Sequence, residues 1–117
     1  PLLSYSPLAG GLLTGKYLNE NMPHDSRMTR MSTIGDRVNK NAMKAVQEYM
    51  KISKKFNIHP VHLALAFCTK RPFMGSVIFG ATTDEQLDVV IKGLDVDLND
   101  EIMEEISLVY KNYALTF

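Results

Sequence analysis

Only two segments of this sequence have the pattern of β-strands, and helical patterns separate them. The first, Leu2–Ser6, is short and apolar-biased and is closed by Pro7, while the second, Ser76–Phe79, is continuously apolar, as is typical of a buried parallel strand. Strands that alternate with helices predict a parallel sheet of βα units. Two parallel strands alone leave edges and apolar faces uncovered, so the pattern predicts a slice of a larger α/β sheet or barrel.

About four helices are predicted around these strands. Pro60 fits the first position of a helix that is apolar nearly all round and should be buried on most sides. Thr83 followed by Gln86 matches a capping box. The four helices are expected from Asn39 or Asn41 to about Phe56, from about Val61 to Lys70, from Thr83 to about Lys92, and from near Asn99 onward. In the third of them the residues expected to face inward are Leu87, Val90, Ile91 and Leu94.

The stretch from Asn19 to about Asp36 is polar and lacks a regular period. A loop of this length is usually a functional lid or a disordered excursion, and the sequence favours neither. We therefore expect either a flap that closes over a bound ligand or a mobile surface segment.

Charge and cysteine content exclude several classes of partner. The 117 residues include 13 Lys and Arg and 13 Asp and Glu, so there is no net field to attract nucleic acid or an anionic membrane. One cysteine, Cys68, cannot form an internal disulfide, which indicates a reducing compartment and a cytoplasmic protein. No apolar run approaches the roughly 18 residues of a membrane span. The start at Pro1, without Met, leads us to expect a piece of a longer protein.

The first candidate site follows the first strand, in the segment YSPLAGGLLTGKY at Tyr5–Tyr17. Glycines let backbone N–H groups approach a ligand closely, and Ser6, Thr14 and Lys16 add two hydroxyls and a cation. This combination suits a phosphate or pyrophosphate at the carboxyl end of a strand, where α/β folds place their ligands. The alternative is an ordinary glycine-rich turn.

The second candidate site is the segment Gly80–Gln86, where a helix begins directly after the second strand. A capped helix N-terminus in this position is an anion site by geometry, and Thr82 and Thr83 could donate to a phosphate. The alternative is that Thr83 only caps the helix and Gln86 completes the box.

Together, YSPLAGGLLTGKY and FGATTDEQL at Phe79–Leu87 resemble the C-terminal part of an aldo-keto reductase. The similarity is greatest to the branch that contains Tas-type reductases and potassium-channel β subunits, and it covers nearly the whole chain. It implies that residues 1–117 are a C-terminal fragment of a TIM-type (β/α)8 barrel, with Leu2–Ser6 as strand seven and Ser76–Phe79 as strand eight. The family binds NADP(H) in an extended conformation without a Rossmann motif.

The resemblance also implies a cofactor site. Tyr5 would stack on the nicotinamide, the loop after it would follow the pyrophosphate, and Arg27 would clamp the cofactor from the long loop. The residues implied are Tyr5, Ser6, Pro7, Leu8, Gly10, Gly15, Lys16 and Arg27 from the first region, and Gly80, Thr82, Thr83 and Gln86 at the adenosine end. Two departures leave the choice between NADP and NAD open: Thr83 stands where many members have Lys or Arg, and Val90 replaces an Asn.

By the same resemblance, the catalytic Asp, Tyr, Lys and His of the family come from the N-terminal half, so this chain alone should be inactive. His24, His59 and His62 are expected to be structural or solvated, and no motif suggests a metal site. The leading hypothesis is the cofactor-binding portion of an NADP(H)-dependent reductase of aldehydes or ketones. The alternatives are a nucleotide-binding regulatory module like the β subunits and a truncated product without function. The expected partners are the dinucleotide, a small carbonyl substrate, and the N-terminal part of the barrel or a second copy.

Overall fold

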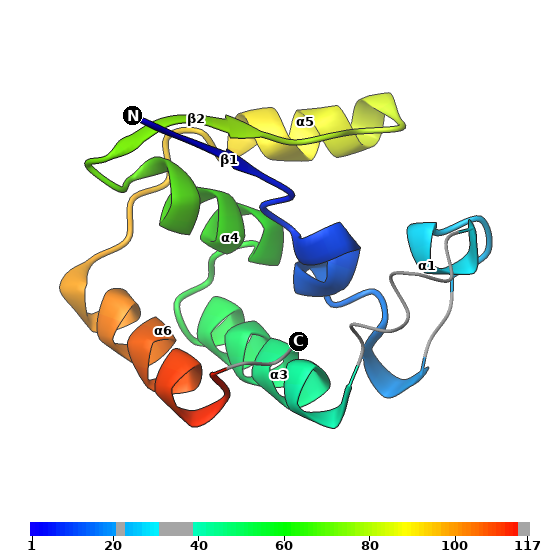
Figure 1. Cartoon of the computed structure of the whole chain (residues 1–117), viewed down its shortest axis with the longest axis horizontal. Helices are drawn as coiled ribbons and strands as arrows, with labels where there is room; N and C mark the ends of the chain where they lie inside the picture. Colours follow the sequence, from blue (N-terminus) through cyan, green and yellow to red (C-terminus); the bar gives the residue numbers. More distant parts are fainter. Residues whose placement is uncertain (21–22, 31–38, 115–117) are drawn as a thin grey trace.

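The computed structural model, which describes residues 1–20, 23–30 and 39–114, arranges the chain in two layers with one helix between them (Figure 1). Helix α4 lies between a layer of strands β1 and β2 with helix α5 and a layer of helices α3 and α6. The elements are β1 (Leu2–Tyr5), the 3-10 turns η1 (Ala9–Thr14) and η2 (Leu18–Glu20), α1 (Arg27–Arg30), α3 (Lys40–Lys55), α4 (Pro60–Thr69), β2 (Met74–Ile78), α5 (Asp84–Lys92) and α6 (Asp100–Asn112).

The two strands pair in parallel, which confirms the predicted α/β class. Ser4 lies opposite Val77 and Tyr5 opposite Ile78, so both strands end at the same edge of the sheet. Strand β2 begins and ends earlier than the predicted Ser76–Phe79. Its last residue is Ile78 because β1 ends at Tyr5: the next residue, Ser6, leaves the extended conformation with a φ of 55°.

Helix α4 has two apolar stripes on opposite sides, which explains its apolar sequence. Val61 and Leu65 pack with Val90 of α5 and Val77 of β2, whereas Leu63 packs against the α3–α6 core. Each stripe follows i, i+4 spacing, and an offset of two residues turns the second stripe to the other side. The prediction that this helix is buried on most sides is therefore confirmed.

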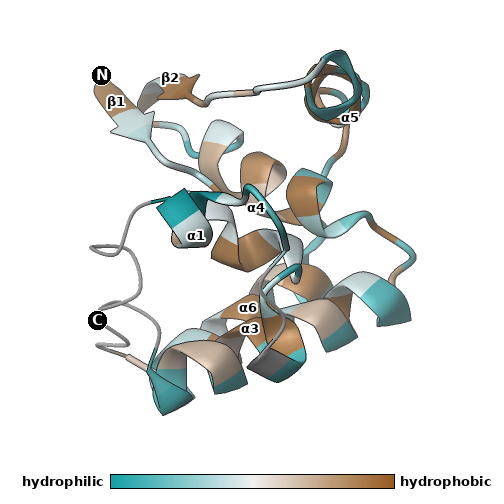
Figure 2. Cartoon of the chain, turned by 90° about the vertical axis from the view of Figure 1, so that its right-hand side faces the viewer, coloured by the Kyte–Doolittle hydropathy of each residue, from teal (hydrophilic) through white to brown (hydrophobic). Residues whose placement is uncertain are grey.

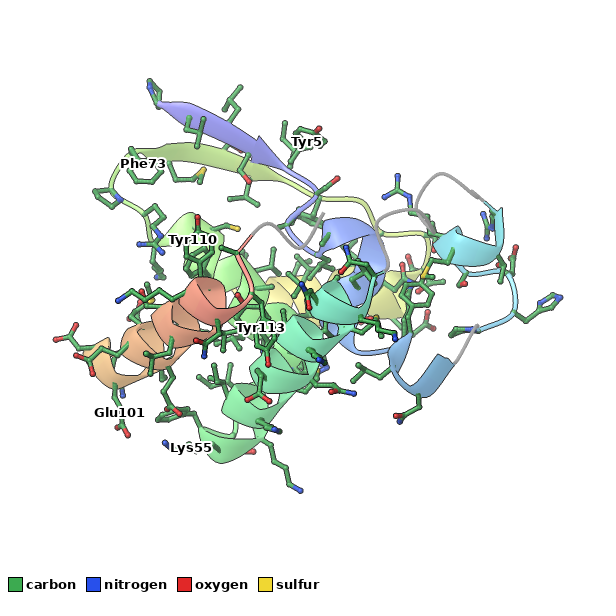
Figure 3. The ribbon with its side chains drawn as sticks, turned by 60° about the horizontal axis from the view of Figure 1, so that its bottom comes forward. Tyr5, Lys55, Phe73, Glu101, Tyr110 and Tyr113 are labelled. Atoms are coloured by element: carbon green, nitrogen blue, oxygen red, sulfur yellow. The ribbon has the colours of Figure 1, made fainter. Side chains whose placement is uncertain are left out.

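Helices α3 and α6 form the core of the other layer. The buried side chains of this core are Ala45 and Ile52 of α3, Leu63 of α4, and Ile102, Ile106 and Val109 of α6. Asn39 and Asn99 cap the two helices, with side-chain oxygens that accept from the amides of Ala42 at 2.8 Å and Ile102 at 2.9 Å. Lys55 of α3 pairs with Glu105 of α6 at 3.0 Å on the exposed rim, opposite Glu101 (Figure 3).

The inward face predicted for α5 is mostly wrong. Val90 is buried, but Leu87, Ile91 and Leu94 are exposed because none of the described elements covers that side of the helix. Gly93 ends α5 with a φ of −90°, so left-handed backbone is not the reason for glycine there. A Cβ at this position would collide with the ring of His62, and this close approach of α4 accounts for the glycine.

In its described residues, the expected loop Asn19–Asp36 is more ordered than the structureless segment we predicted. The described part of Asn19–Asp36 contains the end of η2 and the short helix α1. The rest of that expected loop lies outside the described residues. Met28 of α1 packs against a cluster of Leu12, Tyr17 and Val46, so this end of the loop rests on η1 and α3.

Candidate functional site

The parallel pairing brings the two predicted loops to one edge of the sheet. Tyr5 is the last residue of β1, its side chain is 77% exposed, and its ring stands clear of the sheet (Figure 3). Its partner Ile78 precedes the loop at Gly80. An exposed aromatic face therefore lies at the point where both loops leave the sheet.

The first loop turns tightly through left-handed backbone. Gly10 and Gly11 have φ values of 69° and 99°, and Ala9 before them has 51°. The amides of Ala9 and Gly11 donate to the carbonyls of Ser6 and Leu8, both at 2.9 Å. Glycine is needed here because other residues pay a steric penalty in this conformation.

Apolar contacts anchor the first loop to the helices. Pro7 is buried, and Leu8 packs against the Val61 and Leu65 stripe of α4. At the far end, Gly15 has a φ of 82° and faces Met50 of α3. The loop is thus fixed at both ends, which suits a rigid cradle.

Two of the polar side chains of the first loop have partners within the loop. Thr14 Oγ1 donates to the carbonyl of Gly11 at 2.7 Å and accepts from the amide of Lys16 at 3.3 Å. Lys16 Nζ lies 5.2 Å from the ring centroid of Tyr17. Ser6, in contrast, is exposed at the strand end beside Tyr5. Of the hydroxyls in this loop, Ser6 is the better placed for a ligand, and contact of Lys16 with a phosphate stays a prediction.

Arg27 is an exposed cation on the turn that packs against this loop. Arg27 is the first residue of α1 and Arg30 is the last, and Arg30 pairs with Asp25 at 2.7 Å. Within residues 1–20, 23–30 and 39–114, no carboxylate lies within ion-pairing distance of Arg27. A guanidinium that has no carboxylate partner in the described part of the chain, beside a glycine loop, suits a phosphate.

The second loop is organised around Gln86. Its backbone amide donates to Thr83 Oγ1 at 3.1 Å, so Thr83 caps α5 as predicted. The side chain of Gln86 departs from the capping box: its Oε1 accepts from the amide of Thr82 at 2.8 Å instead of that of Thr83. The position of a Cβ on Gly80 is unoccupied, since a Cβ there would meet no atom within 4 Å. The segment 80–86 is exposed throughout, but the amide and the hydroxyl of Thr82 both donate to Gln86 Oε1, the hydroxyl at 3.1 Å.

The two loops differ in charge. The second loop carries Asp84 and Glu85 in the first turn of α5 and no cation, and Val90 is buried in an apolar cluster. It offers hydroxyl and amide donors only. An aromatic face, an exposed hydroxyl and a cation at the first loop fit the ring and pyrophosphate of a dinucleotide. The second loop, which the resemblance assigns to the adenosine end, has donors but lacks a positive charge within 79–91.

Two histidines have structural roles that the sequence did not specify. His59 Nδ1 accepts from the amide of Val61 at 3.2 Å and caps α4, while His62 Nε2 donates to the carbonyl of Val89 at 2.6 Å and ties α4 to α5. Their ring centroids lie 5.0 Å apart. Burial, and then the neighbouring His62, lowers the pKa of His59. A His directly before Pro60 was the available signal for the cap.

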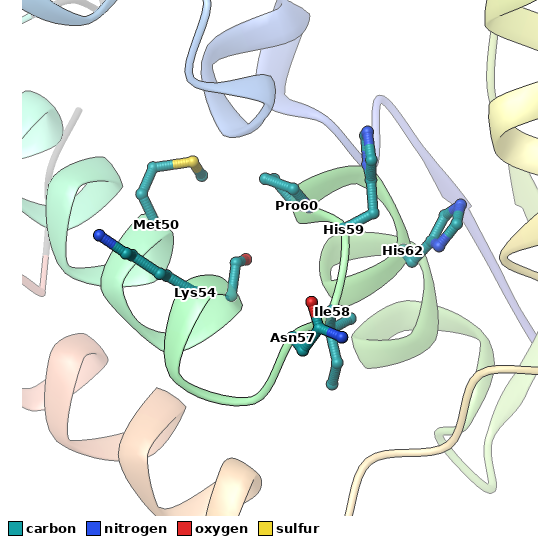
Figure 4. A pocket seen from close by; sticks show the side chains of 8 residues that line it. Met50, Lys54, Asn57, Ile58, His59, Pro60 and His62 are labelled. Atoms are coloured by element: carbon teal, nitrogen blue, oxygen red, sulfur yellow. The ribbon is translucent and has the colours of Figure 1, made fainter.

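A shallow hollow of about 570 Å³ lies between the end of α3 and the start of α4 (Figure 4). Its lining residues are Met50, Ser53, Lys54, Asn57, Ile58, His59, Pro60 and His62. None of them belongs to the two strand-end loops.

In the described part of the chain, no group of three or more His, Cys, Asp or Glu side chains could hold a metal ion. No helix of that part is long and apolar enough to cross a membrane.

Known proteins resemble this chain over most of its length. The sequence model of the Aldo/keto reductase family matches residues 1–111. Protein tas of Escherichia coli is 38% identical over 97% of this chain and 33% of its own length. A probable voltage-gated potassium channel subunit beta of Oryza sativa is 34% identical over 95% of this chain and 35% of its own length. L-glyceraldehyde 3-phosphate reductase of E. coli is 33% identical over 80% of this chain and 28% of its own length.

These matches confirm the resemblance to the branch with Tas-type reductases and channel β subunits. The chain spans about a third of the length of the curated relatives it matches. A family match across residues 1–111, with parallel strands that bring two glycine-containing loops to one edge, leads to one conclusion. The chain belongs to the aldo/keto reductase family.

Proposed function

We propose that this chain forms one wall of the NADP(H) site in a (β/α)8 barrel that reduces aldehydes or ketones. In this proposal β1 and β2 are barrel strands seven and eight, and the chain is the C-terminal third of the barrel. The observation that supports this proposal most strongly is the pairing of Tyr5 with Ile78, because it brings the loops after both strands to one edge of the sheet. Ligands of parallel α/β folds bind at such edges.

Each part of the site has a role in this proposal. Tyr5 stacks on the nicotinamide, while Ser6 and the loop from Pro7 to Gly10 follow the pyrophosphate, with Gly15 and Lys16 beyond. Arg27, on the turn that packs against this loop, binds a phosphate. The adenosine end of the proposed site comprises Gly80, Thr82, Thr83 and Gln86. A bound nicotinamide would supply the hydride for a carbonyl carbon.

Orientation and binding are this chain's contribution, and acid–base chemistry would come from the remaining two thirds of the barrel. The 117-residue chain alone is therefore expected to show no turnover. Measuring the mass of the intact protein from its native source decides whether the chain occurs alone or within a complete barrel.

The test of the site compares two arginines on the same short helix. In the intact native protein, Arg27→Ala should weaken NADPH binding by about 10- to 100-fold, because charge-assisted hydrogen bonds contribute about 1.5–3 kcal/mol. Arg30→Ala, which removes a cation already paired with Asp25, should change it less than about twofold. Binding is measured by titrating NADPH fluorescence.

The same titration with NADH locates the Arg27 contact on the cofactor. A larger loss for NADPH would assign Arg27 to the 2′-phosphate, and equal losses would assign it to the pyrophosphate. If Arg27→Ala and Arg30→Ala behave alike, Arg27 is a solvated surface residue and the clamp is wrong.

A second candidate function is a regulatory nucleotide-binding subunit. The match to proteins named as potassium channel β subunits, at 34% identity in Oryza sativa, favours it. Steady-state reduction of a panel of aldehydes by the intact protein separates the two, since a regulatory subunit would bind NADPH and turn over slowly or not at all.

A further inference from the structure

A buried tyrosine connects the glycine loop to the turn that carries Arg27. Tyr17 is 2% exposed, and its hydroxyl accepts from the amide of Met28 at 3.3 Å. The side chain of Ser26, which is 8% exposed, lies close enough to this hydroxyl to lower the pKa of Tyr17. One phenol group therefore bonds the residue after Arg27 and lies beside the residue before it.

The turn needs such support, because a four-residue helix has too few internal bonds to be stable. Thr29 Oγ1 donates to the carbonyl of Ser26 at 2.7 Å, which closes the turn locally. Beyond that, the apolar contact of Met28 with the Leu12 cluster and the bond to Tyr17 attach α1 to the rest of the fold.

At its other side, Tyr17 is packed against the glycine loop. A Cβ on Gly11 would lie 3.3 Å from Tyr17 Cε2 and 2.9 Å from Lys16 Cε, so the absence of a side chain at Gly11 makes room for both. The ring is thus fixed relative to the backbone amides of the loop.

We propose that Tyr17 is a positioning residue whose buried hydroxyl holds the Arg27 turn beside the glycine loop. Its effect on ligand binding rests on the proposed function. A preformed turn lowers the entropic cost of ordering Arg27 when a phosphate-bearing ligand binds. The clasp defined by Tyr17, Ser26 and Met28 would then let Arg27 and the loop amides act on the same ligand.

The first test removes only the hydroxyl. Tyr17→Phe should speed hydrogen exchange of the Met28 amide by about three- to tenfold in the intact protein, because the amide loses its acceptor. Tyr110→Phe, a change at an exposed tyrosine of α6, serves as the matched control and should leave this segment unchanged. Unchanged exchange at Met28 in Tyr17→Phe would overturn the clasp.

The second test is a double-mutant cycle on NADPH binding. Tyr17→Phe should weaken binding by about three- to tenfold in the wild-type background and by less than about twofold in the Arg27→Ala background. Equal losses in both backgrounds would mean that Tyr17 supports only the glycine loop, and positioning through Arg27 would be wrong. If Arg27→Ala alone has no effect, the proposed clamp fails, and hydrogen exchange still decides whether the clasp exists.

Discussion

The two layers of the molecule differ in how completely each buries its own apolar side chains. In the α3–α6 layer, Ile102, Ile106 and Val109 are all at most 7% exposed. In the sheet layer, Leu3 of β1 is 64% exposed and Ile91 of α5 is 52% exposed. Figure 2 shows the hydrophobic colour of α3, α6 and α4 where these helices face one another, and hydrophobic segments of β1, β2 and α5 at the other side of the molecule.

This difference indicates which layer can stand without further partners. Full burial of a large apolar side chain contributes about 1.5–3 kcal/mol, whereas a whole domain is stable by about 5–15 kcal/mol. Leaving several such side chains exposed on the strands and α5 therefore costs a large share of the available stability. The α3–α6 layer closes its core with Leu63 of α4, although Leu108 of α6 is 57% exposed, whereas the sheet layer needs a covering surface.

The largest expected effect is a cavity in the closed layer. Ile106→Ala should lower the free energy of unfolding by about 2–5 kcal/mol, because the methyl groups removed are buried among α3, α4 and α6. Ile91→Ala, in the open layer, should cost less than about 1 kcal/mol in the isolated chain, since Ile91 is 52% exposed. Urea denaturation followed by circular dichroism measures both changes. Equal losses for the two variants would contradict the contrast between the layers.

A second effect concerns association. The isolated chain should pair with other barrel segments or with itself, because β1, β2 and α5 present apolar surface. Leu3→Lys, on the exposed strand, should shift sedimentation toward the monomer. The control Gln47→Lys, at an exposed polar position of α3, should leave sedimentation unchanged. A sharp cooperative melt of a monomer at low concentration would show that the open layer needs no cover.

Features that depend on neighbouring residues in the sequence were predictable. Asn99 and Thr83 cap their helices as their types suggest, and Pro60 begins α4. The site was predicted as two loops at strand ends, and the parallel pairing brings these loops to one edge. All of these follow from local patterns and from the geometry of parallel sheets.

Features that depend on distant partners were not predictable. The period of α5 indicates an apolar stripe, but it cannot say whether a covering surface is present, and Ile91 is exposed. The bond between Tyr17 and Met28 joins residues eleven positions apart through a turn with no sequence signature. The bond of the Gln86 side chain to Thr82 is local, but it was not predictable either, because it follows from the loop geometry and not from residue type.

The smallest expected effect is a pH dependence at the helix between the layers. Burial, together with the nearby His62, lowers the pKa of His59, and its Nδ1 must be unprotonated to accept from Val61. The folded state therefore resists a proton that the unfolded chain accepts near its ordinary pKa of about 6.5. Stability should be complete above that pH and decline as pH falls below it. His62, which lines the same hollow, disfavours a positive charge on His59.

His59→Asn tests this assignment, because asparagine caps a helix well and does not titrate. Between pH 7 and 5 the variant should lose less stability than the wild type, by about 0.3 kcal/mol, since solvent screens the largely exposed ring. His24→Asn is the matched control for an exposed histidine without a cap, and its pH profile should follow the wild type. If the stability of His59→Asn and of the wild type falls equally between pH 7 and 5, the acid sensitivity arises elsewhere. In that case the His59 cap does not contribute to it, and packing alone joins α4 to the two layers.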